Sequence, residues 1–460
     1  MKVDLSKIPK DVIEAMKILH SHGYQAYIVG GAVRDLLLGK SPSDYDIATD
    51  ATPEEVMKIF EQHGWKAVPT GIEFGTVLVL PPSRSIKIEV TTFRKEMYKE
   101  ERGRKPIVSW AKSLREDVER RDFTINALAI DIHGNVIDYV GGVEDLRRGI
   151  IRFVGNPDER IREDPLRMLR ALRFATKLGF TIDPETFEAI KRNVEKITRV
   201  SMERIRDEIL KAAETKRFHK FIELLYKSGL YRYIIPELEE MNRVSHHPET
   251  KGHHGETVFE HTLEVLKRLD EVGAHPELKI AALLHDIGKI KFGPVSKHFH
   301  LHEVYSAEMA REILRRLRFS NREIERITKI IEAHMIPINM LNQGVPPEKI
   351  VSRLIAKYGD LAPEILIHAY ADTGNRIFLE LAREARERLR MMSTKPLVTG
   401  SDLLKLFPGR APGPWIKELK EKLFEIQIRK GLKNKYKVIE EAVKEGVLPK
   451  EVLERINVLI

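Results

Sequence analysis

The sequence predicts an α/β domain at the amino terminus, followed by a chain that is essentially all helical. Helix-like and strand-like runs alternate over residues 1–146, whereas β-rich runs end near Glu144. From there, periodic apolar residues separated by short polar turns continue to the last residue. With 460 residues, 42% of them hydrophobic, the chain is long enough for about two to four folded units.

The elements of the amino-terminal domain follow from its apolar pattern. Apolar spacing predicts helices over residues 12–19 and 33–38, and strands over residues 26–29, 75–80 and 86–93. Beyond this domain, Pro and Gly residues mark the turns between helices, and a stretch rich in both over residues 393–414 precedes a basic helical segment. The sequence therefore predicts a small separate tail.

Composition narrows the classes of function. The chain has no Cys, which excludes disulfides, thiolate zinc sites and cysteine nucleophiles, so any metal must lie on His, Asp or Glu. The formal net charge of +9 suits a polyanionic partner such as RNA without requiring one. No apolar run reaches the roughly 18 residues of a membrane span, and the amino terminus is charged rather than signal-like. We therefore expect a cytoplasmic protein without a membrane partner.

A Gly-Gly turn and two nearby aspartates indicate phosphate chemistry. Gly30 and Gly31 follow an apolar run and open a helical pattern, so backbone amides and a helix amino terminus would face one point that favours a phosphate. The alternative is a tight turn in which Arg34 pairs with Asp35. Asp44 and Asp46 lie two apart in a predicted strand and so point to the same face. Paired hard oxygen ligands beside phosphates suit magnesium, although an isolated Asp-x-Asp is usually a solvated turn.

A second motif begins at Asp164, which has the features of a helix N-cap followed by Pro at the first helical position. On that predicted helix, a cationic arc of about 120° opposes an apolar face. Only Glu163 is spaced to pair with the first cation of the arc, so the surplus charge indicates phosphates or bases. The arc consists of Arg167, Arg170, Arg173 and Lys177.

Histidine is concentrated in one block, because ten of the 17 His residues lie between His246 and His302. His261, His285, Asp286 and Asp372 supply two imidazoles and two carboxylates, which is a workable site for one divalent ion. Any one of these residues taken alone is more often structural.

Together these motifs resemble the class II tRNA nucleotidyltransferases and their bacterial poly(A) polymerase relatives that carry an HD domain. The resemblance covers nearly the whole chain and implies a polymerase-β-like nucleotidyltransferase head followed by an all-α neck, body, HD domain and tail. It divides the chain into a head (1–146), a neck and body (147–242), an HD domain (243–392) and a tRNA-binding tail (393–460). The motifs that carry it are Gly-Gly-Ala-Val-Arg-Asp at 30–35, Asp-Tyr-Asp-Ile-Ala-Thr at 44–49, Arg-Arg-Asp-Phe-Thr-Ile-Asn-Ala at 120–127, Glu-Asp-Pro-Leu-Arg at 163–167, and the order His, His-Asp, Asp at 261, 285–286 and 372.

The resemblance also implies a role for each matching residue. Asp44 and Asp46 would be catalytic and hold magnesium, and Asp164 and Arg167 would read the incoming base. Glu89 could supply a third carboxylate or be an ordinary exposed strand residue, and it is not counted among the site residues. The other nucleotide-binding residues would be Gly31, Arg34, Arg121, Asp122, Asn126, Arg170 and Arg173. A divalent transition metal would lie on His261, His285, Asp286 and Asp372, with His302 and His334 as further candidates.

The implied activity is addition of C and A to tRNA 3′ ends from CTP and ATP without a nucleic-acid template, with the tRNA acceptor arm as partner. An accessory HD phosphohydrolase activity is also expected. The alternatives are a partial enzyme that adds only CC or only A, a bacterial poly(A) polymerase, a phosphohydrolase with an inactive head, and a non-enzymatic RNA-binding protein. The segment 94–110, with charged residues over 99–105, is interpreted as a complete loop, which favours a full CCA-adding or an A-adding enzyme.

Overall fold

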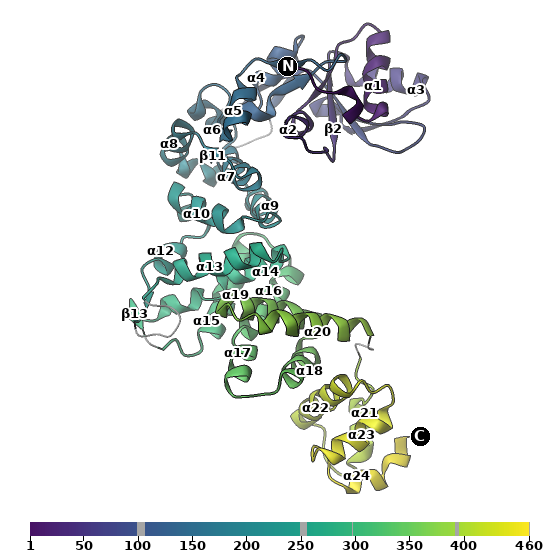
Figure 1. The fold of residues 1–460 in the computed structure, drawn as a ribbon, viewed down its shortest axis with the longest axis vertical. Helices are drawn as coiled ribbons and strands as arrows, with labels where there is room; N and C mark the ends of the chain where they lie inside the picture. The colour runs from purple at the N-terminus through teal and green to yellow at the C-terminus, as the bar shows by residue number, and fades with distance from the viewer. Residues whose placement is uncertain (99–105, 249–254, 297, 392–394, 460) are drawn as a thin grey trace. The chain divides into compact units, whose positions relative to one another are not determined.

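The computed structural model describes residues 1–98, 106–248, 255–296, 298–391 and 395–459 (Figure 1). These residues form two compact units. The first comprises Met1–Ala212 with Glu223–Ile234, and the second comprises Ala213–Ile222 with Ile235–Ile460. An α/β domain followed by a largely helical chain, as the sequence predicts, is confirmed.

A seven-stranded mixed sheet forms the amino-terminal domain, with the strand order β3-β4-β5-β2-β1-β8-β9. Only the pair β2 and β5 is parallel among the neighbours within this described sheet. The predicted strands over 26–29, 75–80 and 86–93 are confirmed with small shifts at their ends. The strands are β1 (Ala26–Val29), β2 (Tyr45–Thr49), β3 (Lys66–Gly71), β4 (Thr76–Leu80), β5 (Ile88–Thr92), β8 (Leu128–Ile130) and β9 (Val136–Asp138).

The two faces of this sheet carry different layers. Ile28 and Ile47 lie in a core that is covered by α1 (Lys10–Ser21), α2 (Gly31–Leu37) and α3 (Pro53–Gln62). Val29 and Ala48 lie in a second core, on the opposite face, together with residues of α4 (Leu114–Glu119). Because side chains alternate along a strand, Asp46 shares the face of Ala48. The fold therefore turns this carboxylate away from α1 and α3 and towards the second core.

The sequence predicts a loop over 94–110, whereas the described residues of this segment form mainly a two-stranded ribbon. β6 (Arg94–Met97) pairs antiparallel with β7 (Ile107–Trp110), in the register Arg94 to Trp110 and Met97 to Ile107. Each strand has only four residues and lacks a regular alternation of apolar and polar residues, so the ribbon carries only a weak sequence signal. The charged tip over 99–105 lies outside the described residues.

Helices then continue the first unit. The predicted helix start at Asp164 is corrected: Asp164 ends α6 (Pro157–Glu163), and α7 (Arg167–Leu178) begins two residues later than Pro165. The Asp164 carboxylate accepts a hydrogen bond from the Leu166 backbone nitrogen (3.2 Å), which stabilises the turn between the helices. The remaining elements of this unit are α5 (Gly142–Arg148), α8 (Pro184–Arg192), α9 (Met202–Ala213), α11 (Tyr231–Ile234), and the short parallel strands β10 (Ile150–Ile151) and β11 (Thr181–Ile182). Helix α10 (Phe218–Ser228) is divided between the units, because its residues up to Ile222 belong to the second unit.

The second unit is helical apart from one pair of two-residue parallel strands, among its described residues. Helices α13, α14, α15, α16 and α19, which carry or adjoin the clustered histidines, pack against one another, and α22 of the tail packs against α18. The elements are α12 (Leu238–Met241), β12 (Ser245–His246), α13 (Val258–Glu271), α14 (Pro276–Leu284), β13 (Val295–Ser296), α15 (His302–Arg316), α16 (Asn321–Ala333), α17 (Met335–Asn342), α18 (Pro347–Tyr358), α19 (Ala362–Thr373), α20 (Ile377–Met391), α21 (Gly400–Leu406), α22 (Pro414–Lys430), α23 (Lys435–Lys444) and α24 (Glu451–Glu454).

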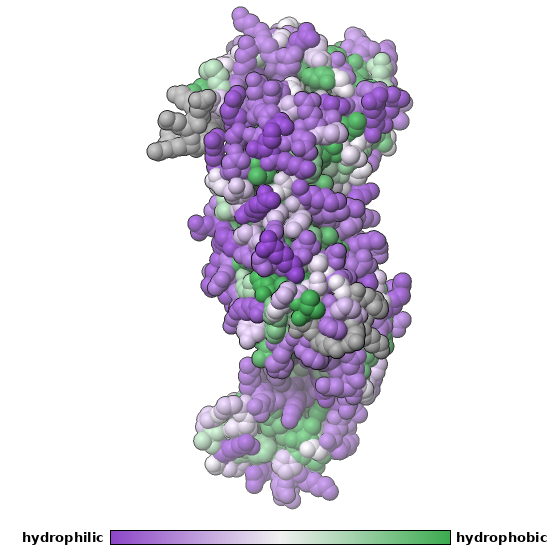
Figure 2. All heavy atoms as spheres, turned by 90° about the vertical axis from the view of Figure 1, so that its left-hand side faces the viewer, coloured by the Kyte–Doolittle hydropathy of each residue, from purple (hydrophilic) through white to green (hydrophobic). Residues whose placement is uncertain are grey.

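Hydrophilic side chains predominate on the face shown in Figure 2, as expected for a chain with 32% charged residues. None of the helices in the described parts of the chain combines the length and the apolarity that a membrane span requires.

A buried ion pair in the second unit gives a test of stability. Lys279 Nζ lies 2.7 Å from Asp270 Oδ1, and the two side chains are 2% and 1% exposed. The backbone and ring nitrogens of His219 lie 3.0 and 2.7 Å from the other Asp270 oxygen. We expect Asp270→Asn to lower the free energy of unfolding by about 3–5 kcal/mol in urea titrations, because it leaves the Lys279 charge buried and unpaired. Glu325→Gln, which breaks an exposed pair with Lys329, should cost less than about 1 kcal/mol.

The same ion pair predicts a pH dependence. Burial alone would raise the pKa of Asp270, but the hydrogen bonds from His219 and Lys279 outweigh burial and lower it. The stabilisation is therefore complete above the unfolded-state pKa of about 3.9 and is lost as the pH falls through the folded-state pKa. The stability difference between wild type and Asp270→Asn should shrink below about pH 4. A constant difference down to pH 2 would contradict this assignment.

Candidate functional site

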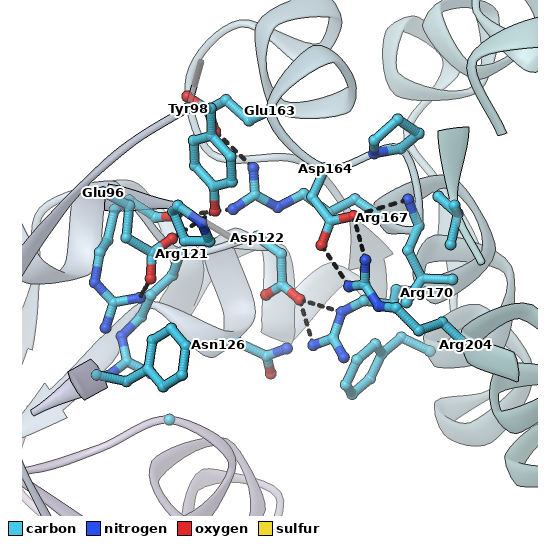
Figure 3. Close-up of a pocket in the computed structure, with 18 of the residues that line it drawn as sticks. Glu96, Tyr98, Arg121, Asp122, Asn126, Glu163, Asp164, Arg167, Arg170 and Arg204 are labelled. Carbon is cyan, nitrogen blue, oxygen red and sulfur yellow. Dashed lines mark hydrogen bonds and ion pairs between the residues drawn. The ribbon is translucent and has the colours of Figure 1, made fainter. Parts of the chain in front are cut away.

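The first unit contains a cavity of about 800 Å³, which is within the usual size of small-molecule sites (Figure 3). Nine Arg and Lys side chains and five Asp and Glu side chains line it, so the cavity favours an anionic ligand. Of the predicted catalytic and nucleotide-binding residues, Asp44 and Arg173 are not in its wall. Those that line it are Gly31, Arg34, Asp46, Arg121, Asp122, Asn126, Asp164, Arg167 and Arg170.

The Gly-Gly turn connects β1 to α2 at the edge of this cavity. Gly30 has a φ of 75°, in the region that favours glycine, and a Cβ there would lie 3.4 Å from Arg121 Nη1 and 3.7 Å from Asp46 Oδ2. A Cβ on Gly31 would lie 3.3 Å from Arg34 Nη2. The buried Arg34 guanidinium donates to Asn126 Oδ1 (2.7 Å) and pairs with Asp35. The turn therefore brings backbone, guanidinium groups and a carboxylate close together.

Carboxylates gather on one face of the sheet beside this turn. Asp46 lies directly opposite Glu89 in the parallel pairing of β2 with β5. Burial, and next the charge of Glu89, raise the pKa of Asp46 to about 6. Asp44 immediately precedes β2 and is exposed. These hard oxygen donors fit a divalent cation, which would relieve the repulsion between them. Glu89, which was not counted as a site residue, is placed next to the predicted pair.

A buried aspartate that is absent from the predicted site residues, Asp117, holds two arginines of the cavity. Asp117 on α4 lies 3.1 Å from Arg120 Nη2 and 3.3 Å from Arg121 Nη2, and it also accepts from the Arg94 backbone nitrogen. Burial alone would raise the pKa of Asp117, but Arg121 and Arg120 outweigh burial and lower it. Its i+3 and i+4 spacing to the two arginines was a signal that could have identified it.

Two of the predicted cationic residues have carboxylate partners from distant parts of the chain. Arg170 donates through Nε (2.9 Å) and Nη2 (2.5 Å) to Asp122 Oδ2, which joins two predicted nucleotide-binding residues to each other. Arg173 is buried and donates to Glu208 on α9. The charge surplus inferred from local spacing is therefore partly compensated, and Arg173 is paired outside the cavity wall.

The remaining pair, Asp164 and Arg167, sits at the junction of α6 and α7 (Figure 3). Arg167 Nη1 donates to Glu163 (2.6 Å) and to the Arg160 carbonyl (3.0 Å), and Nη2 donates to the Arg120 carbonyl (3.3 Å). The Tyr98 ring lies 5.8 Å from the guanidinium carbon. These contacts fix the guanidinium and use three of its five N–H donors, which leaves two for a ligand among the described contacts.

In the second unit, the four predicted metal ligands converge. His261 Nε2 lies 2.8 Å from Asp372 Oδ1, and His285 Nε2 lies 3.3 Å from Asp286 Oδ2. His302 and His334, the further candidates, join them through an Nε2 to Nε2 distance of 3.1 Å. Among the described residues, three groups drawn from these six have ligand atoms within 4.8 Å of one another.

Backbone hydrogen bonds orient the histidine rings. His285, His302 and His334 each donate from Nδ1 to the carbonyl three residues earlier, at 2.6, 2.9 and 2.6 Å. This bond assigns the proton to Nδ1 and leaves the Nε2 lone pair facing the cluster, as metal-binding histidines require. His285 Nε2 is buried and makes no hydrogen bond to any described residue, although Asp286 Oδ2 lies 3.3 Å away. The cluster is therefore preorganised for a cation.

The electrostatics of this cluster also fit a divalent cation. Burial alone would raise the pKa of Asp286, but His285 and Lys289 outweigh burial and hold it well below its ordinary value. The pKa of His285 is raised to about 10, because Asp286 outweighs the lowering by burial, while burial and the charge of His285 lower the pKa of His334 to about 3. Ionised carboxylates beside imidazoles suit a transition metal of intermediate softness. Such a metal would replace the proton that His285 holds in its absence.

Two further residues of this cluster were not predicted. Lys289 Nζ lies 2.8 Å from Asp286 Oδ2, and His368, which is fully buried, packs with its ring 4.7 Å from that of His285. His368 stands one helical turn before Asp372 on α19, so helical spacing could have placed it on the same face. Lys289 follows Asp286 by three residues, a spacing that also indicates proximity.

A sheet with clustered carboxylates beside an arginine-rich cavity, followed by helices and a His-Asp cluster, defines a nucleotidyltransferase with an HD domain. Three family models match the chain: "Poly A polymerase head domain" over residues 26–152, "Probable RNA and SrmB- binding site of polymerase A" over 179–242, and "HD domain" over 258–373.

Some known relatives match nearly the whole chain. The CCA-adding enzyme of Anoxybacillus flavithermus is 34% identical over 433 residues, which is 94% of this chain and 96% of that protein. The chain belongs to the family of CCA-adding enzymes. The crystal structure of the Bacillus stearothermophilus CCA-adding enzyme in complex with CTP is 29% identical, has a TM-score of 0.67, and is matched over 95% of this chain and 98% of that one. The fold is also that of the Thermotoga maritima CCA-adding enzyme complexed with tRNA, with 22% identity, a TM-score of 0.63, and coverage of 97% and 100%.

Proposed function

We propose that the first unit adds C and A to the 3′ end of tRNA from CTP and ATP, without a nucleic-acid template. The observation that carries this proposal is that one cavity is lined both by the carboxylate Asp46 and by the pair Asp164 and Arg167. Asp46 would hold the metal ion for the transfer reaction, and Asp164 with Arg167 would select the base. Family membership and the CTP complex of a relative support the proposal.

In the proposed reaction, the terminal 3′-hydroxyl oxygen of the RNA bonds to the α-phosphorus of the nucleotide, and the hydroxyl proton passes to water. The bond between the α-phosphorus and the oxygen that bridges to the β-phosphorus breaks, and pyrophosphate leaves. Asp44 and Asp46, with Glu89 beside them, would hold magnesium, which supplies activation of the hydroxyl and charge neutralisation when bound. Arg34 and Arg121 lie close to the Gly-Gly turn and Asp46, where phosphate charge would be held. The ion pair of Asp122 with Arg170 would orient the sugar end of the nucleotide.

Asp164 and Arg167 would select the base by their hydrogen-bonding capacity. The Asp164 carboxylate can accept from the exocyclic amine of cytosine or adenine. The two remaining Arg167 donors match N3 and O2 of cytosine, and one of them matches N1 of adenine. Uracil and guanine present the opposite order of donors and acceptors, so each would leave buried groups unsatisfied at a cost of about 1–3 kcal/mol.

The Asp164→Ala enzyme tests this choice. We expect the preference for CTP over UTP, and for ATP over GTP, to fall by about tenfold to a hundredfold in kcat/KM, because the carboxylate acceptor is gone. Glu159→Ala, which removes a charge from the exposed side of α6, should keep the preference. If Asp164→Ala still prefers CTP and ATP as the wild type does, selection by the protein is wrong.

The function as a whole is tested with three tRNA transcripts that end before the CCA, after one C, and after CC. We expect the enzyme to complete all three to CCA and then stop, as read from product length on sequencing gels with CTP and ATP supplied together. Addition of a single A to the CC-ended transcript alone would identify an A-adding enzyme. Long tails on many RNAs would instead identify a poly(A) polymerase.

We infer a second activity for the His-Asp cluster, hydrolysis of 2′,3′-cyclic phosphates or small phosphomonoesters. The convergence of His261, His285, Asp286 and Asp372, with His302 and His334 adjacent, supports it. These side chains would hold a divalent transition metal, which polarises a phosphoryl oxygen and activates water when bound. Lys289, held against Asp286, would add positive charge beside a bound phosphate. Such an activity would prepare RNA ends for nucleotide addition.

We propose that these activities divide along the chain as a head (1–146), a neck and body (147–242), an HD domain (243–392) and a tail (393–460). We propose that the tail binds the tRNA acceptor arm, because basic residues lie along α22 and α23. There they would contact phosphates without reading the base sequence. A cytoplasmic location stays a prediction.

A further inference from the structure

Three N–H groups donate hydrogen bonds to the Asp164 carboxylate and fill most of its acceptor positions. Oδ1 accepts from the Leu166 backbone nitrogen (3.2 Å) and from Arg204 Nη1 (3.4 Å), and Oδ2 accepts from Arg204 Nη2 (2.9 Å). An ionised carboxylate offers about four acceptor positions. The contacts among the described residues therefore leave one position, on Oδ2, which is the number that a single exocyclic N–H requires.

Arg204 reaches this carboxylate from a different element. It lies on α9, forty positions beyond Asp164, and it lines the same cavity (Figure 3). Its planar fork bonds both carboxylate oxygens at once, which a side chain with one donor direction cannot do. Asp164 is the C-cap residue of a short helix, so without the fork its carboxylate is held only by the adjacent turn.

We propose that Arg204 is a positioning residue for base selection: it fixes the Asp164 carboxylate so that a single acceptor faces the incoming base. This inference rests on the proposed function of the cavity. With Arg204 in place, Asp164 can take one amine hydrogen and cannot turn to admit a water that would satisfy the carbonyl oxygen of uracil or guanine. Without Arg204, the carboxylate can rotate and the penalty against the wrong bases falls.

The Asp164 and Arg204 side chains are 24% and 49% exposed, so their ion pair contributes little to the stability of the fold. A role confined to stability would therefore leave the choice of nucleotide unchanged. The ratio of kcat/KM values between right and wrong nucleotides is the readout that separates the two roles.

The experiment compares wild type, Arg204→Ala, Arg204→Lys and Arg206→Ala on a tRNA transcript lacking CCA, with each of the four nucleoside triphosphates supplied singly. Arg206, on the same helix, pairs with Asp207 and does not line the cavity, so Arg206→Ala removes the same charge nearby. We expect Arg204→Ala to reduce the preference for CTP over UTP about tenfold, since one orienting pair of hydrogen bonds is lost. Arg204→Lys, which keeps the charge but loses the fork, should give an intermediate preference. Arg206→Ala should match wild type.

An equal loss of kcat/KM with all four nucleotides in Arg204→Ala would overturn the proposal. A higher kcat/KM for CTP at an unchanged ratio of CTP to UTP would also overturn it, because Arg204 would then compete with the base for Asp164. If Arg204→Ala is unstable in thermal melts, the ratio measured for Arg204→Lys decides in the same way. A wild-type enzyme that adds nucleotides without preference would refute base selection by the cavity itself, and so the proposed function. A selective wild type with a fully selective Arg204→Ala refutes only the role of Arg204.

Discussion

Replacing Asp46 with Asn is expected to abolish nucleotide addition, with a loss of about 10³-fold or more in kcat, while the first unit stays folded. The amide has the shape of the carboxylate but neither its charge nor its affinity for a hard cation. Incorporation of radiolabelled ATP into a CC-ended tRNA transcript measures the loss. Glu61→Gln, which removes an exposed charge on α3 away from the cavity, is the control and should retain activity.

Asp46→Asn should lose activity without losing thermal stability. Asp46 is half-buried and lies opposite Glu89, so its negative charge is unfavourable in the folded protein without a cation. Because the folded-state pKa of Asp46 is raised to about 6, the destabilisation is present at pH 8 and is lost progressively as the pH falls from about 6 to the unfolded-state pKa of about 3.9. In EDTA at pH 8, Asp46→Asn should therefore melt at the same temperature as wild type or higher. A clearly lower melting temperature would show that the activity loss reflects unfolding.

Replacing Asp286 should produce the complementary loss. We expect Asp286→Ala to lose hydrolysis of 2′,3′-cyclic phosphates by about 10³-fold or more, because this carboxylate contacts two parts of the cluster. Its Oδ2 lies 3.3 Å from His285 Nε2, and its Oδ1 lies 3.2 Å from His302 Nε2. Metal content by mass spectrometry should fall in parallel. Nucleotide addition should stay within about twofold of wild type, since the residues for that reaction lie in the other unit.

The controls separate chemistry from folding. Asp286→Ala leaves Lys289 without its buried partner, so Asp286→Asn, which preserves the shape, is measured beside it. Asp360→Ala removes a carboxylate that is 76% exposed in the same unit and should keep both activities. Joint loss of hydrolysis and nucleotide addition in both Asp286 variants would indicate that the cluster is only structural.

The amino-terminal elements could be predicted closely because their apolar spacing is regular. The strand over 26–29 is found with the predicted ends, and the helix over 12–19 lies within α1. The ribbon of β6 and β7 was missed, because each strand has four residues and little apolar alternation. The start of α7 was misplaced, since the Asp and Pro signal of an N-cap also fits the turn that joins α6 to α7.

The residues that carry charge in the cavity were found by motif, but their partners were not. Asp122 with Arg170, Arg173 with Glu208, and Asp164 with Arg204 are separated by 48, 35 and 40 positions, and no local spacing rule reaches so far. The convergence of the histidine cluster likewise depends on helix packing. Sequence gives the ligand types, whereas the packing of α13, α14, α16 and α19 decides which of the block's histidines meet.

The position of β1 in its sheet affects how the protein folds during synthesis. β1 is a central strand that pairs with β2 nearby but also with β8, where Ile28 lies opposite Ile130. The sheet is therefore completed only after about a hundred further residues have been made, and contacts of such high sequence separation form slowly. Until β8 emerges from the ribosome, the backbone groups of β1 that later bond to β8 are unpaired. An exposed, mostly apolar strand edge of this kind associates with other chains. The bond from Arg34 to Asn126 forms only after the same interval, so assembly of the nucleotide cavity is tied to completion of the sheet.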